Sequence, residues 1–170
     1  MPPSESSGTA HRRPPVAEDF PRTGPFSLAA PAPRFAARAV DLALVLAPAA
    51  IVVAFTARTV GGQVRLDIPA WLGPSLLALG VTYEWLSVLV AQRTVGKALF
   101  GLRLVRYVDG GRPTTAQALL RALLPWSVLA LPLGPFAVAL FLCVYGTGIA
   151  GSLHRGWPDL AGGTIELSTR

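Results

Sequence analysis

Three long apolar stretches divide this 170-residue chain and predict its helices. The first covers about residues 36–57 and the second about residues 70–91. Each has the length of roughly 20 helical residues that crosses a hydrocarbon core. The third, from residue 118 to about residue 151, is too long for one span and contains "PLGP" at residues 132–135, which breaks or kinks a helix. The pattern therefore predicts two spans and a divided third region.

The third region favours two short helices, at about residues 115–131 and 135–151. The first of these begins amphipathically around Arg121. The alternatives are one long kinked span, or an interfacial helix followed by a span. The expected fold is an all-α membrane protein, a small transmembrane helix bundle of three to four spans.

The polar segments have different compositions. Residues 1–33 are rich in Pro, Ser and Gly and predict a disordered tail rather than a signal peptide, leaving residues 34–170 as the membrane domain. In the connection after the second span, Thr94 is expected to cap a short amphipathic helix. Residues 102–115 then have the pattern of a short hairpin, to which "TIEL" at residues 164–167 can add a strand. That strand would bring Asp159 close to Arg38 or Lys97.

Composition and charge favour a membrane protein. Hydrophobic residues make up 52% of the chain and charged residues only 14%, a composition that disfavours a soluble globular protein. The net charge of +6 is concentrated outside the apolar stretches, mostly before the first span and after the second. This distribution predicts a cytoplasmic N-terminus. The abundance of Arg and Ala is typical of GC-rich bacteria, so the expected location is a bacterial plasma membrane. No aromatic residues alternate with the arginines, which excludes a nucleic-acid surface.

Charged residues also lie inside the predicted spans. On a helix, Arg34, Arg38 and Asp41 share one face, and a stripe of alanines lies opposite. Such small residues let another helix approach closely. Glu84 lies on the small-residue side of the second span. Because an ionised group in a membrane needs a partner or water, we expect these four residues to form a polar cluster near the cytoplasmic side.

Four segments in order resemble the RDD family of bacterial membrane proteins, named for one arginine and two aspartates. They are "RFAARAVDLAL", "YEWL", "RTVGKALFGLRLVR" and "HRGWPDLAGGTIEL", and the resemblance covers about residues 33–168. It implies that the family arginine is Arg38 (or Arg34), that the aspartates are Asp41 and Asp159, and that the T-x-G-K element is Thr94, Gly96 and Lys97. The spacing around Asp159 is one residue longer than usual. Some members are linked to sodium and proton exchange.

Enzymatic chemistry finds no support in the sequence. His11 and His154 lack the spacing of a metal site, and no serine or cysteine occupies a nucleophile motif. The "RTVGKALFG" segment is not a phosphate-binding loop, because a single glycine precedes the lysine and alanine follows it. We therefore expect no enzyme, no cofactor and no metal.

Two functions remain. In the first, the charge network of Arg34, Arg38, Asp41 and Asp159 is structural, and the protein is a membrane module that binds a membrane-protein partner or assembles with itself. In the second, Asp41 and Glu84 are protonatable groups in a cation or proton pathway. The absence of an internal repeat disfavours transport by one copy.

Overall fold

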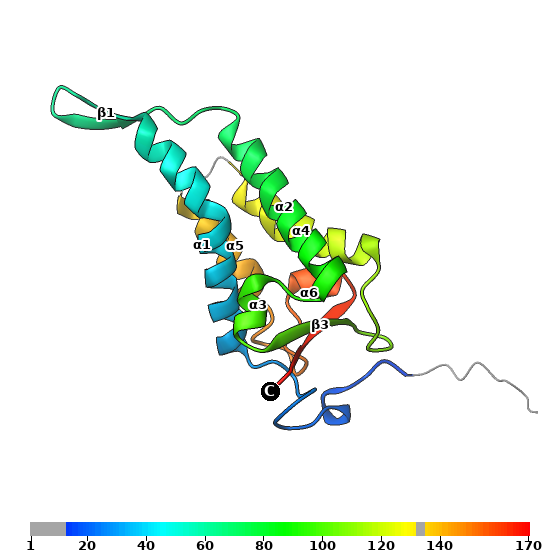
Figure 1. Cartoon of the computed structure of the whole chain (residues 1–170). Coiled ribbons are helices and arrows are strands. Elements are labelled where there is room, and N and C mark those ends of the chain that lie inside the picture. The colour runs from blue at the N-terminus through cyan, green and yellow to red at the C-terminus, as the bar shows by residue number, and fades with distance from the viewer. Residues whose placement is uncertain (1–12, 132–134) are drawn as a thin grey trace, which may run out of the picture.

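The computed structural model describes residues 13–131 and 135–170, and this part of the chain is mostly helical (Figure 1). Two pairs of short strands accompany the helices. The elements, in chain order, are η1 (Ala17–Asp19), α1 (Pro31–Thr56), β1 (Ala57–Val60), β2 (Gln63–Leu66), α2 (Leu72–Ala91), α3 (Val95–Leu99), β3 (Leu102–Arg106), α4 (Thr115–Leu129), α5 (Pro135–Gly146), α6 (Trp157–Ala161) and β4 (Thr164–Ser168).

Helices α1 and α2 are long and apolar enough to cross a membrane. They contain 26 and 20 residues, close to the predicted ranges, and α1 starts at a proline, whose missing N–H costs nothing in a first turn. Only 22% of the most apolar window of each helix is buried. Their apolar surface is therefore mostly outward, as lipid contact requires and a soluble core does not.

Helices α4 and α5 are shorter than predicted, with 15 and 12 residues. At 1.5 Å per residue each is about 22 Å long or less, so neither crosses a hydrocarbon core of roughly 30 Å by itself. The two helices pack against each other, and α4 also packs along α2. Trp126 of α4 lies at the centre of this core with Leu42, Val45 and Phe141. A bundle of three to four full spans is thus not established, whereas two candidate spans are.

A small antiparallel sheet closes one end of the molecule. Strand β3 pairs with β4, with Val105 opposite Ile165, so "TIEL" adds a strand to β3 as expected. The local hairpin predicted over residues 102–115 is wrong. After β3 the chain only closes a turn, in which the Arg106 N–H donates to the Gly111 carbonyl at 2.8 Å. Strand β4 takes the place of the second hairpin strand because its apolar face packs against β3.

The segment before α1 is structured in its described part. The expectation of disorder over residues 1–33 does not match residues 13–30, and residues 1–12 lie outside the described residues. Leu28 bridges Leu167 on the outer edge of β4, and the Ala29 N–H donates to the Glu166 carbonyl at 3.1 Å. Tyr107 donates to the Pro15 carbonyl at 2.7 Å. The open edge of β4 offers backbone partners that composition alone does not reveal.

A hairpin, β1–β2, lies between α1 and α2 and was not expected from the sequence. Its turn is Gly61 and Gly62, both with positive φ (60° and 77°), a geometry that glycine adopts without strain. The hairpin projects from the end of α1 that is far from the β3–β4 sheet (Figure 1).

Most of the alanine stripe of α1 is exposed in the part of the chain that the structure describes. Ala39, Ala43 and Ala47 are exposed, whereas Arg38 and Asp41 on the other side are buried. The charged face, and not the alanine face, is therefore the inner face of α1.

Candidate functional site: a buried charge network

Eight ionisable side chains lie together where α1, α2, α3, α4, α6 and β4 meet. Four are cations and four are carboxylates, so their formal charges balance. No more than 14% of any of these side chains is exposed, and only one exceeds a few per cent. The members are Arg34, Arg38, Lys97, Arg121, Asp41, Glu84, Asp159 and Glu166.

Arg38 and Glu84 join α1 to α2 by a bidentate ion pair. Arg38 Nη1 donates to Glu84 Oε2 at 2.9 Å, and Nη2 donates to Oε1 at 2.8 Å. The Trp126 indole N–H of α4 donates to Glu84 Oε2 at 3.0 Å. The Arg38 guanidinium also lies 4.2 Å from the ring centroid of Tyr145. Two parallel charge-assisted hydrogen bonds fix both distance and orientation, so this pair sets how the two long helices cross.

Asp41 is held by Tyr83 of α2 and by the segment that follows this helix. Its Oδ1 accepts from the Tyr83 hydroxyl at 2.7 Å and from the Gly96 N–H at 2.9 Å, and its Oδ2 accepts from the Thr94 hydroxyl at 2.6 Å. Thr94 also accepts from the Lys97 N–H at 3.4 Å, as the N-cap of α3. The T-x-G-K element is therefore a docking element for Asp41.

Gly96 lies where α3 crosses α1. A Cβ at this position would be 2.0 Å from the Ala37 carbonyl oxygen, a backbone atom that cannot rotate away. It would also be 2.9 Å from Asp41 Oδ1. Only glycine allows the two backbones to approach this closely.

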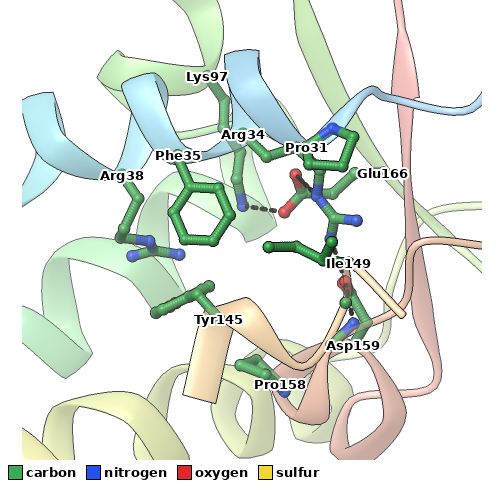
Figure 2. A pocket seen from close by; sticks show the side chains of 12 residues that line it. Pro31, Arg34, Phe35, Arg38, Lys97, Tyr145, Ile149, Pro158, Asp159 and Glu166 are labelled. Carbon is green, nitrogen blue, oxygen red and sulfur yellow. Dashed lines mark hydrogen bonds and ion pairs between the residues drawn. The ribbon is translucent and has the colours of Figure 1, made fainter. Parts of the chain in front are cut away.

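The C-terminal segment supplies the other two carboxylates. Asp159, in the first turn of α6, contacts the guanidinium groups of Arg34 and Arg121. Glu166 on β4 contacts Arg34 Nε at 2.8 Å, Lys97 Nζ at 3.0 Å and the guanidinium of Arg121. Figure 2 shows Lys97 reaching toward Glu166, with Arg34 and Asp159 on the same side. Ion pairs thus connect the start of α1 to the C-terminal segment.

The sequence-derived residues come together with different partners from those expected. Asp159 pairs with Arg34 and not with Arg38, whose partner is Glu84. Asp41 forms hydrogen bonds with neutral donors and none with an arginine. Thr94, Gly96 and Lys97 all touch the network.

Two members were missed by sequence reasoning. Arg121 has 1% of its side chain exposed and contacts Asp159 and Glu166, with its Nε 3.7 Å from Glu84 Oε1. Its position inside "ALLRALL" is the same signal that marked Asp41, a charge in an apolar stretch. Glu166 alternates with apolar residues on a strand, which predicts an exposed side chain, and so gave no signal.

Burial and neighbouring charges shift the pKa values of Lys97 and Glu166, which both lie outside the two long helices. Burial, together with the Arg121 guanidinium, lowers the pKa of the Lys97 ammonium below its ordinary value. Burial by itself would raise the pKa of Glu166, but Arg34, Lys97 and Arg121 together hold that pKa well below 4.5. Glu166 is therefore ionised in the folded protein at neutral pH.

The low pKa of Glu166 predicts acid sensitivity. A carboxyl with a lower pKa in the folded state stabilises the fold above its ordinary pKa, and this stabilisation is lost as the pH falls toward the folded value. We expect the thermal unfolding temperature of the purified protein to decrease as the pH is lowered below about 4.5. In Glu166→Gln, which is less stable at neutral pH, this acid-dependent fall should be smaller. Parallel pH profiles for the two proteins would contradict this role of Glu166.

A small cavity adjoins the network. It is lined by Phe35, Ile149 and Pro158 together with Arg34 and Lys97 (Figure 2). The volume of the cavity is about 20 Å³, which is room for one water molecule and not for an organic ligand. Within residues 13–131 and 135–170, no three His, Cys, Asp or Glu side chains gather as a metal site.

A family model described as the RDD family matches residues 28–163. The chain belongs to the RDD family. No curated protein and no solved structure matches the chain. The RDD match and the two apolar helices together indicate a membrane protein. Seven of the eight network residues lie within the RDD region, and Glu166 lies just beyond its end.

Proposed function

We propose that this RDD protein is a membrane interaction and assembly module whose Arg–Asp network is structural. The observation that carries this proposal is the saturation of the carboxylates by protein donors. Every oxygen of Asp41 and Glu84 accepts at least one hydrogen bond from a side chain or a backbone N–H. A network that is closed on itself favours a role in holding helices together.

Cation or proton transport is the alternative, and it gains less from the geometry. A bound Na⁺ needs oxygen atoms whose lone pairs point at it, because hard cations are coordinated by oxygen ligands. The three groups around Asp41 all direct hydrogens at the carboxylate instead. A proton carrier at Glu84 would first have to break its bidentate pair with Arg38. Turning these donors away from Asp41, or breaking the Arg38–Glu84 pair, costs several kcal/mol in a buried site.

The proposed topology is multi-pass with a cytoplasmic N-terminus, in a bacterial plasma membrane. Residues 28 and 167 bridge each other, and β3 pairs with β4, so the start of α1, the end of α2 and the C-terminal strand share one end of the molecule (Figure 1). Helix α1 then leaves this side and α2 returns to it. The α4–α5 pair must begin and end on it, which supports an even number of crossings or a pair of short helices entering from one side.

The partner in this proposal is a second copy or another membrane protein. The outward alanine face of α1, including Ala39, Ala43, Ala47 and Ala50, has the small side chains that let helices associate in lipid. The buried network would keep this face rigid while it binds.

The test is Asp41→Asn in the full-length protein. This variant keeps the side-chain shape but replaces charge-assisted hydrogen bonds with neutral ones, so it should lower the free energy of unfolding by about 1–2 kcal/mol. The abundance of folded protein should fall accordingly. Flux of Na⁺, K⁺ and protons in reconstituted liposomes should equal that of protein-free liposomes for both wild type and variant.

Asp67→Asn is the matched control, because Asp67 is exposed in the connection between the two long helices. It should change neither stability nor flux. Transport would replace the structural proposal if wild type and Asp67→Asn carried ions, and Asp41→Asn lost that flux at undiminished abundance.

A further inference from the structure

The β1–β2 hairpin is an unusual connection between two apolar helices. All eight of its strand residues are exposed. An isolated two-stranded hairpin is marginally stable in water, and this one lacks a covering helix or a third strand in the described chain. It follows Thr56 directly and precedes α2 by five residues, so it lies at the membrane surface if α1 and α2 cross the bilayer.

One face of the hairpin carries two arginines directly opposite each other. Arg58 pairs with Arg65 in the register, beside Val60 and Gln63 on the same face. Like charges in this arrangement destabilise a hairpin unless an anion lies between them. Among the described residues, neither arginine has a carboxylate partner within ion-pair distance. Both arginines are exposed, so their donors are accessible to an anion outside the described part of the protein.

The opposite face is apolar. Thr59 faces Val64 and Ala57 faces Leu66 across the strands. Val64 is 70% exposed and Leu66 is 52% exposed, and they are followed by Ile68 and Trp71 at 61% and 56%. Exposed apolar residues ending in a tryptophan are typical of a segment lying in the membrane interface.

We propose that this hairpin binds an anionic phospholipid, with Arg58 and Arg65 holding the headgroup phosphate and the Val64–Leu66 face resting on the acyl chains. Guanidinium groups suit phosphate oxygens because each presents paired N–H donors in a plane. The phosphate supplies the negative charge that no described residue provides between the arginines. The hairpin thereby anchors the ends of α1 and α2 that are remote from the charge network.

The test compares lipid binding by the full-length purified protein and by Arg58→Gln/Arg65→Gln. Phosphatidylglycerol and phosphatidylcholine are titrated into detergent solutions, and bound lipid is counted by native mass spectrometry. Each arginine contributes to the binding of anionic lipid, so the double variant should bind phosphatidylglycerol about tenfold to thirtyfold more weakly. Phosphatidylcholine binding should change little, and inorganic phosphate should not displace phosphatidylglycerol.

Arg22→Gln/Arg112→Gln is the matched control, since both residues are exposed and lie away from the hairpin in the chain. It removes the same charge and should bind phosphatidylglycerol like the wild type. Equal binding by wild type and Arg58→Gln/Arg65→Gln would overturn the proposal, as would an equal loss in the control. Displacement by inorganic phosphate would assign the pair to a free anion instead of a lipid. These outcomes are independent of Asp41 and of the proposed function.

Discussion

Arg121→Gln is expected to lower the free energy of unfolding by about 3–5 kcal/mol, one of the two largest losses at the network. Arg121 contacts Asp159 and Glu166 directly, and it approaches Glu84 at 3.7 Å. The variant leaves two buried carboxylates short of a positive charge. Gln keeps polar atoms at the site but cannot compensate that charge. The loss is measured as the free energy of unfolding in mixed micelles, with a denaturing detergent as the variable.

Arg112→Gln is the control for this change. Arg112 precedes α4, its side chain is exposed, and it forms no ion pair among the described residues. Its replacement should alter the stability by no more than about 0.5 kcal/mol. If Arg121→Gln and Arg112→Gln were equally stable, Arg121 would not be holding the C-terminal carboxylates.

Arg38→Met is expected to cause the second large loss, again of about 3–5 kcal/mol. Glu84 is fully buried, and without Arg38 it retains the indole N–H of Trp126 and the more distant cations Arg121 and Lys97 as favourable neighbours. The penalty is the cost of an uncompensated buried charge and not merely the loss of two hydrogen bonds. Thermal unfolding in detergent should show a lower midpoint, and less of the purified protein should elute as a single species.

The helices could be predicted from the sequence because their signals are local. Runs of about 20 apolar residues predict α1 and α2, and the Pro and Gly residues at 132–135 divide the later region. The end of α5 was predicted too late, at residue 151 instead of Gly146. Apolar composition continues past Gly146, whereas the chain turns there to bring α6 back to the network.

The β pairing depended on contacts distant in sequence. The alternation in residues 102–115 predicted a strand at β3, but its partner lies some 60 residues later and not across the adjacent turn. The described part of the N-terminal segment becomes ordered for the same reason, since Leu28 uses the edge of β4. Composition measures how much apolar surface a segment can bury, and it does not register an available strand edge.

The charge network was predicted in membership better than in pairing. Periodicity placed Arg34 and Arg38 on one face, one turn apart, so it could not decide which of them meets Asp159. That choice is made in three dimensions: Arg34 lies level with α6 and β4, and Arg38 lies level with Glu84. Asp41 was expected to need a partner or water, and its partners are two hydroxyl groups and a backbone N–H.

The central claim is that the buried charges act by holding helices together, and a double-mutant cycle on Arg38 and Glu84 tests it most directly. Stability is measured for the wild type, Arg38→Met, Glu84→Gln and the double variant under identical micelle conditions. If the pair clamps α1 to α2, each single change exposes the other partner's desolvation cost. The double variant then loses less than the sum of the singles, with a coupling energy of about 2 kcal/mol or more. Strictly additive losses would contradict the claim.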